Sequence, residues 1–210
     1  MGMGFDAALA VGANPHTFSG SSTRFDFVNY GVATDQEHID SAGITGSRTR
    51  RHDRMRSGII RLQGPVVFDV SHGIWDFFLP YILGAAESSN TFDVADALPA
   101  FDALYDHGNA GSTALKHVEL YVNRASLRFA PGLLRLTLDL IGKTETTGQT
   151  FTSAALGVGA PYAPMAFWDT ASGFSLQGSS REIDEGELII DNQLEVQFRN
   201  ATTAQSIKAQ

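Results

Sequence analysis

The sequence predicts a mainly β protein: an antiparallel β-sandwich or barrel-like protomer with one short flanking α-helix. Apolar residues alternate with polar residues over several runs, and a tight-turn sequence separates the two longest runs. One further stretch places its apolar residues at helical spacing. The chain has 210 residues, 43% of them hydrophobic, so it is long enough to bury one substantial core.

The clearest predicted strands are HVELYVNRASLRF at 117–129 and LLRLTLDLIGKTE at 133–145. Every other residue is apolar across Val118–Val122 in the first run and across Leu134–Leu140 in the second. The residues APG between the runs favour a tight turn, so we expect an antiparallel hairpin with one buried face. Similar alternation predicts further strands at 24–32, 58–70 and 187–198.

The stretch SHGIWDFFLPYILG at 71–84 predicts the helix, with Ser71 as its N-cap and Gly84 as its stop. Pro80 removes one backbone hydrogen bond and is expected to shorten or kink it. A membrane-bound or partner-docking helix is one interpretation. We favour a helix packed across one end of the β-sandwich, since no basic residues flank it.

Three other stretches lack a clear period. Residues 1–22 are expected to form an N-terminal arm, and 23–210 a single β-rich domain. Residues 31–57 hold few apolar residues and many Gly, Ser, Thr and Arg, which predicts a long interface loop. Residues 144–164 predict a second Gly- and Thr-rich connection.

The charge of the chain is segregated. The formal net charge is -8, yet the segment GSRTRRHDRMRSG at 46–58 carries five arginines and one acid. The remainder therefore holds 10 basic against 22 acidic residues. Such a dipolar protomer attracts a second copy when the two poles can face each other. The candidate interface residues are Arg48, Arg50, Arg51, Arg54 and Arg56.

No motif indicates catalysis or a cofactor, and we expect neither. The chain has no cysteine, its six histidines show no metal-binding spacing, and GVGAPY at 157–162 is an incomplete phosphate-binding sequence. The aspartates between Asp93 and Asp106 do not match a calcium loop. The acidic run at 181–198 is read as a solvated or interface-forming face rather than an acid/base pair.

Without a signal peptide or a membrane span, a soluble protein made in the cytoplasm is expected.

The arginine cluster has three interpretations. It could bind phosphates, but the acidic remainder repels a polyanion and the loop offers no aromatic stacking platform. It could be a solvated, disordered loop. It could also be an interface loop that pairs with carboxylates of a neighbouring copy. This interpretation alone accounts for both the excess of Arg over Lys, 12 against 3, and the acidic remainder.

The segment at 43–85, an Arg-rich loop followed by a strand and a DFFLPYILG helix, resembles the tail tube (major tail) protein of long non-contractile-tailed bacteriophages. The run LIIDNQLEVQFRNATTAQSI at 188–207 is similar to the closing strand and following loop of that family. The resemblance extends from Arg24 to Ile207. It implies a virion protein, assembled in the host cytoplasm, whose hexameric rings stack into a hollow tube for DNA ejection.

The resemblance also implies partners and site roles. The five arginines would join subunits or rings, and further partners would be the tape measure protein and the terminator and distal tail proteins. DNA would pass through without specific binding, along a wall for which Glu119, Asp139 and Glu195 are candidate acids. Another ring protein, such as a terminator, a baseplate component or the tube of a contractile injection system, is an alternative. A carbohydrate-binding β-sandwich using Trp75 and Trp168 is a more distant one.

Overall fold

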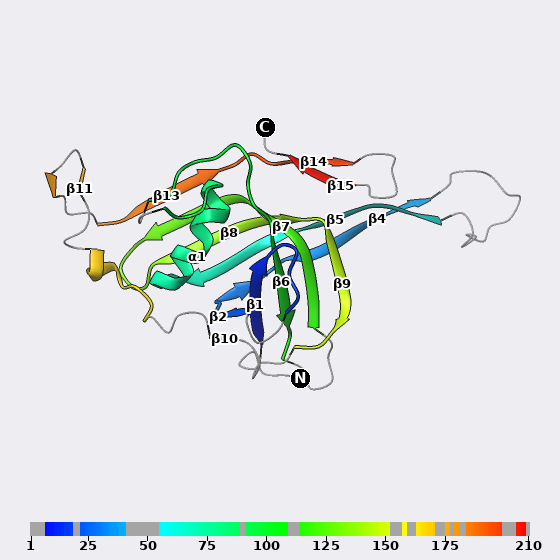
Figure 1. Ribbon diagram of the computed structural model, residues 1–210, viewed down its shortest axis with the longest axis horizontal. Helices are drawn as coiled ribbons and strands as arrows, with labels where there is room; N and C mark the ends of the chain where they lie inside the picture. Colours follow the sequence, from blue (N-terminus) through cyan, green and yellow to red (C-terminus); the bar gives the residue numbers. More distant parts are fainter. Residues whose placement is uncertain are drawn as a thin grey trace, which may run out of the picture.

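The computed structural model is an antiparallel β structure with one α-helix (Figure 1). It describes residues 7–18, 22–40, 55–88, 91–108, 114–151, 157–158, 163–170, 175–176, 179–180, 184–198 and 205–208. Among these residues, eleven strands join one hydrogen-bonded network, and every pairing in it is antiparallel except the short one between β10 (Gly157–Val158) and β2 (Thr23–Phe25). The predicted mainly β fold with one short helix is confirmed.

The long strand β7 (Ala114–Phe129) connects the two layers of the fold. Its first half pairs with β6 (Phe101–Asp106) and β9 (Thr144–Gln149). Its second half pairs with β8 (Arg135–Gly142) and β13 (Gly186–Asp191). The pairing of β7 with β8 is the hairpin that the alternation and the APG turn predicted.

Further strands complete each layer. β1 (Ala8–Ala13) lies between β2 and β6 in the first layer, and β5 (Met55–Asp69) pairs with β8 in the second. β3 (Asn29–Tyr30) and β4 (Ala33–Asp40) pair with β5 on its other side. Outside this network, β11 (Ser175–Leu176) pairs with β12 (Ser179–Ser180), and β14 (Glu195–Phe198) pairs with β15 (Gln205–Lys208). A 3-10 helix spans Phe167–Thr170.

The two layers bury one main core between them. Side chains from both layers line one small cavity of about 10 Å³. They include Leu9 of β1, Phe101 of β6, Phe68 of β5 and Leu138 of β8. The leucines of β8 alternate as predicted, since every even-numbered residue across Leu134–Leu140 is buried. This burial of apolar surface is the main source of stability in a chain without disulfides.

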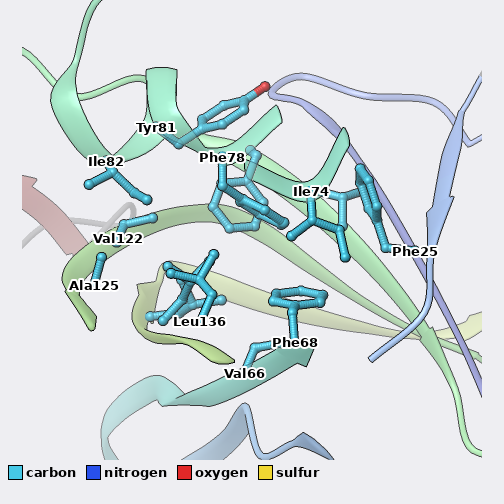
Figure 2. Close-up of a cluster of buried hydrophobic side chains, with 14 of the residues drawn as sticks. Phe25, Val66, Phe68, Ile74, Phe78, Tyr81, Ile82, Val122, Ala125 and Leu136 are labelled. Carbon is cyan, nitrogen blue, oxygen red and sulfur yellow. The ribbon is translucent and has the colours of Figure 1, made fainter. Parts of the chain in front are cut away.

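The helix α1 (His72–Leu83) packs its apolar face onto this core (Figure 2). Ser71 accepts a hydrogen bond from the Ile74 amide at 3.4 Å, and Gly84 ends the helix with a φ of 97°, a conformation that glycine adopts without steric cost. Phe78 is the central contact, since its ring meets those of Phe25, Phe68 and Phe101. Pro80 lies in the last turn, where the helix continues for only three more residues.

The expectation of an N-terminal arm over residues 1–22 is wrong for Ala8–Ala13, which form the interior strand β1. The sequence ALAVGA does not alternate because both of its faces are buried. Leu9 and Val11 face the main core, whereas Ala10 belongs to a second cluster with Leu104 and Ala114. A short continuous apolar run is typical of a strand buried on both faces.

The expectation of an irregular loop over 31–57 is wrong for Ala33–Asp40 and Met55–Ser57, which are paired strands. Their residues are almost all exposed, so no apolar alternation marks them in the sequence. Gly64 on β5 lies close to the backbone of Gly31, just before β4. A Cβ at position 64 would come within 2.1 Å of the Gly31 carbonyl oxygen. The chain therefore requires glycine at position 64, where the link between β3 and β4 runs alongside β5.

Candidate functional site

The most unusual feature of the surface is a pair of strands that projects from the fold. It consists of β4 (Ala33–Asp40) and the first part of β5 (Met55–Arg61), and we call it the projecting hairpin. Figure 1 shows it extending from the body of the molecule along the longest axis. All eight residues of β4 are exposed. A two-stranded hairpin without a covering layer is only marginally stable in water, so this one depends on its root and on any partner it meets.

Apolar side chains are exposed along the projecting hairpin. Ile39 is 53% exposed, and Met55 and Ile60 are each 42% exposed. Charged residues lie beside them, since Asp35 is paired with Arg61 and Ile39 with Arg56 in the register of the two strands. Exposed apolar residues among charges are typical of a surface that binds another protein.

Of the five predicted interface arginines, the structure places one. Arg56 lies on β5 in the projecting hairpin and is exposed. Arg48, Arg50, Arg51 and Arg54 lie outside the described residues. Asp40 and Met55, which flank these four in the sequence, are paired with each other in the hairpin. The interface role of the arginines stays a prediction.

A chain of polar side chains fastens the root of the projecting hairpin to the body. Thr34 on β4 donates a hydrogen bond to Glu145 Oε2 on β9 at 2.9 Å. The same oxygen accepts from Nε2 of His117, on β7, at 3.1 Å. Nδ1 of His117 is hydrogen-bonded to the hydroxyl of Tyr30 on β3. The partners assign a neutral imidazole that donates to the carboxylate and accepts from the phenol. Four strands are thereby joined at one point.

Burial controls the protonation of this network. It lowers the pKa of His117, although the hydrogen bond and charge of Glu145 act in the opposite direction. Burial, followed by the neighbouring Tyr105 and Glu145, raises the pKa of Tyr30 well above its ordinary value. A Tyr-His-Glu series is chemically similar to a proton relay. The His117 side chain is fully buried, whereas Glu145 is partly exposed, and the network joins four strands.

A second buried polar group lies at the other edge of β7. The carboxylate of Asp102 on β6 accepts hydrogen bonds from the Asn14 side chain at 2.6 Å and from the backbone amides of His16 and Glu119, both at 3.0 Å. Lys116 forms an ion pair with it at 3.1 Å. Burial alone would raise the pKa of Asp102, but these donors together hold it below its ordinary value.

The Asp102 contacts also decide the shape of β7. Two residues of β7, Val118 and Glu119, stand opposite Asp102, which makes a β-bulge where Glu119 adopts a φ of 58°. Asp102 therefore has a structural role and is not grouped with the other aspartates of its segment. Within the described part of the chain, no cluster of three or more His, Asp or Glu side chains could hold a metal ion.

The three candidate lumen acids lie in different places. Glu119 binds Lys143 Nζ at 2.6 Å and accepts from the Tyr121 hydroxyl at 3.3 Å, so its charge is paired. Asp139 lies on the outer face of β8, between Arg124 on β7 and Pro65 on β5. Glu195 is exposed on β14, outside the main sheet. The structure does not bring them together, and their lumen role stays a prediction.

Asp139 belongs to a face of mixed charge. On the outer face of β5, β8, β7 and β13, the register sets acids beside arginines in two rows. Arg135 and Asp69 lie 3.5 Å apart, and Ser126 donates a hydrogen bond to Glu187. The charged residues of this outer face are Asp69, Arg124, Arg128, Arg135, Asp139, Glu187 and Asp191. Their charges nearly balance, so the face offers no extended basic surface to a polyanion.

Two grooves lie over this sheet. One, of about 280 Å³, is lined by residues of β5, β8 and β14, including Arg61 and Phe198. The other, of about 230 Å³, includes Pro65 and Asp139. Neither groove contains a tryptophan, although the carbohydrate-binding alternative relied on Trp75 and Trp168.

In the described part of the chain, no helix has the length and apolar character needed to cross a membrane.

The 3-10 helix that contains Trp168 lies at the end of the molecule opposite the projecting hairpin (Figure 1). Trp168 is 69% exposed, and nearby Leu133 is 45% exposed. The exposure of Trp168 excludes a place in the core.

A family model described as phage tail tube protein matches residues 4–209, which is nearly the whole chain. A search of curated proteins finds no match to this sequence.

Proposed function

This chain belongs to the phage tail tube protein family, and we propose that its copies close into hexameric rings which stack into a hollow conduit for DNA ejection. Membership makes it a structural component of the phage tail that assembles with itself and with other tail proteins; the family is not an enzyme family. The ring symmetry, the stacking and the passage of DNA belong to the proposal. The observation that supports them best is the projecting hairpin.

The projecting hairpin has the properties of an assembly element. It exposes Ile39, Met55 and Ile60, and the sequence between its strands holds four arginines. In the proposal, Arg48, Arg50, Arg51, Arg54 and Arg56 pair with carboxylates of neighbouring subunits or rings. The strongly acidic remainder of the chain supplies those carboxylates, so the arginines hold copies together and do not hold DNA.

Unpaired sheet edges support ring closure. Among the described strands, β4 pairs only with β5, and β13 pairs only with β7. They are the two outer strands of the layer that contains β5, β8 and β7. A strand edge that pairs with one neighbour readily accepts another, and pairing between subunits would protect these edges from uncontrolled association. Repetition of such a pairing around an axis closes a ring.

The outer face of β5, β8, β7 and β13 is the surface we assign to the lumen. Asp139 lies on it, between Arg124 and Pro65. Because the acids and arginines of this face stand side by side, a wall built from it gains little from phosphate contacts and lets DNA slide. Glu119 and Glu195 remain candidates, although Glu119 is already paired with Lys143.

The proposed partners follow from the proposed assembly. A tube of defined length requires a tape measure protein inside it, and its two ends require terminator and distal tail proteins. Assembly would take place in the cytoplasm of the bacterial host. The runner-up function is another ring protein of a tail or injection system, which would share the fold and differ in whether its rings polymerise.

Negative-stain electron microscopy of the purified protein over a range of protein and salt concentrations tests the proposal. Hollow rings or tubes of uniform diameter are expected. A variant with Arg50, Arg51 and Arg54 changed to Glu is expected to remain unassembled, while Arg124→Glu, which alters a charge on the lumen face, is the control for a general effect of charge. Rings that never stack at any concentration would favour the runner-up. Monomers that bind a glycan would contradict the proposal.

A further inference from the structure

One group of side chains holds the root of the projecting hairpin against the body. Among the described strands, β3 and β4 pair only with β5, and neither has a backbone pairing with β7 or β9. Side chains make that connection instead. Tyr30 on β3 is hydrogen-bonded to His117 on β7. Thr34 on β4 donates to Glu145 on β9, which also accepts from His117. We call these four residues the root network.

His117 is the buried centre of the root network. Its side chain is 0% exposed, whereas that of Glu145 is 21% exposed. Nε2 donates to the Glu145 carboxylate, and Nδ1 accepts from the hydroxyl of Tyr30. The ring of Tyr30 is in turn stacked on that of Tyr105, with centroids 4.4 Å apart. The closed site therefore fits a neutral imidazole that carries one proton.

A second proton on His117 is incompatible with these hydrogen bonds. Nδ1 would become a donor that faces the hydroxyl of Tyr30, and this hydroxyl would lose the acceptor for its own proton. The buried ring would also carry a charge. Burial opposes that charge more strongly than Glu145 favours it, so the pKa of His117 lies below its ordinary value.

Two further titratable groups approach this site from β6. Burial and the charge of Asp106 raise the pKa of Tyr105, so this phenol stays neutral. The ring of the exposed His107 contacts that of Tyr105, with centroids 4.6 Å apart. A charged His107 repels a charge on His117 and so opposes the second proton. Neither group on β6 stabilises a charged His117.

The groups on the remaining strands do not reverse this preference. Burial raises the pKa of Tyr30 well above its ordinary value, so Tyr30 is not ionised. Lys116, next to His117 on β7, is ion-paired with Asp102. From β4 the root network receives only the uncharged Thr34. The closed protein therefore binds the second proton more weakly than a His117 in contact with water does.

We propose that residues 28–36, which contain β3 and the start of β4, open away from the body when His117 takes up a second proton. Opening breaks the root network and the pairing of this segment with β5, while β5 stays paired with β8 in the body. Acid would thereby loosen the projecting hairpin and its assembly contacts, a consequence that rests on the proposed function. The opening itself is a property of the single chain.

Hydrogen exchange of the unassembled protein tests the opening. The amides of Val28 and Gly31 donate to the carbonyls of Val67 and Pro65, both at 2.8 Å, and lose these bonds when the segment opens. Rates are measured at pH 7.5 and pH 5.5, at several low urea concentrations, and corrected for the intrinsic effect of pH. The opening equilibrium constant should rise about threefold to tenfold at the lower pH, because an exposed histidine charges near pH 6.5.

The urea series separates this opening from global unfolding. A local opening exposes little surface, so its equilibrium constant should change little with urea. Two results would overturn the inference: an opening constant that is equal at the two pH values, or exchange of Val28 and Gly31 only through the urea-sensitive global path.

A pair of histidine variants identifies the responsible group. His117→Gln keeps a polar side chain that does not titrate, and it should remove the pH dependence of the opening. His38→Gln makes the same change at an exposed position of β4 itself and is the matched control, which should keep that dependence. The inference is wrong if His117→Gln keeps the dependence or if His38→Gln removes it.

The ring signals of His117 in the wild type provide a measurement that needs no variant. Nuclear magnetic resonance at pH 5.5 should show the closed protein with a neutral ring protonated at Nε2. A charged ring in a protein whose Val28 and Gly31 amides exchange no faster would overturn the inference. These experiments use the unassembled chain, so they can fail while tubes form, and they can succeed if the proposed function is wrong.

Discussion

The two halves of β5 occupy different environments in one continuous strand. From Leu62 to Phe68 the strand lies in the body, where Leu62, Val66 and Phe68 are buried between two layers. From Met55 to Arg61 it lies in the projecting hairpin, where only one other strand pairs with it. Backbone hydrogen bonds are present in both halves, but apolar burial is concentrated in the first. Folding therefore depends on the body, and the hairpin is available for assembly.

The strongest test of this comparison is a pair of apolar truncations. Leu138→Ala removes a fully buried side chain of the core and is expected to lower the free energy of unfolding by about 2–5 kcal/mol. Ile39→Ala removes an exposed side chain of the hairpin and is expected to change it by less than about 0.5 kcal/mol. Urea unfolding of the unassembled proteins measures both. Equal losses would show that the hairpin is part of the folding core.

A pair of aspartate variants makes the same comparison with polar groups. Asp102→Ala leaves two backbone amides, Asn14 and Lys116 without their common acceptor, so we expect a loss of about 3 kcal/mol in unfolding free energy. Asp35→Ala removes an exposed carboxylate opposite Arg61 and should cost less than about 0.5 kcal/mol. Thermal unfolding at low salt compares the two. A small effect at Asp102 would mean that water replaces its partners.

The pH dependence of stability provides a smaller effect. Because burial lowers the pKa of His117, the unfolded chain takes up a proton as the pH falls through about 6.5, while the folded protein does not. Stability should therefore fall below pH 6.5, by at most about 1.4 kcal/mol per pH unit for this group. Asp102, whose pKa is also lowered, contributes a loss only below about pH 3.8.

His117→Gln isolates that contribution. The wild type should lose more stability than this variant between pH 7.5 and pH 5.5, as measured by urea unfolding at both values. An identical loss in the two proteins would show that another group is responsible.

The smallest expected effect is at the root of the projecting hairpin. Thr34→Val removes the hydrogen bond to Glu145 and keeps the shape of the side chain, so the unfolding free energy should fall by only about 0.5 kcal/mol. Hydrogen exchange of the β4 amides should nevertheless become faster, because this bond ties the hairpin to the body. Unchanged exchange in β4 would show that backbone pairing alone holds the root.

Sequence patterns predicted the strands whose two faces differ in burial. The leucines of β8 alternate strictly because one face meets the core and the other does not. In β7 the same pattern holds at Leu120 and Val122, which are buried, but fails before them, since His117 is fully buried and Val118 is only partly buried. The bulge at Glu119 causes this shift, and it depends on Asp102, a residue of another strand. Local sequence carries no sign of that long-range contact.

The projecting hairpin and β1 escaped prediction for opposite reasons. Both faces of β4 are exposed, so ATDQEHID has no apolar period, and both faces of β1 are buried, so ALAVGA is apolar throughout. The arginine cluster was visible as charge alone, and the pairing of the two strands that flank it in the sequence was not. Family resemblance, not periodicity, indicated the tail tube, and the family match confirms it.

Deletion of residues 41–54 is the most direct test that the body folds alone and that the arginine-rich segment between the strands of the projecting hairpin assembles the protein. Asp40 and Met55 pair across the two strands, so a two-residue Asn-Gly turn can join them. The shortened protein should unfold within about 1 kcal/mol of the wild type, and electron microscopy should show no tubes where the wild type forms them. Tubes of normal diameter and stability from the shortened protein would contradict the account.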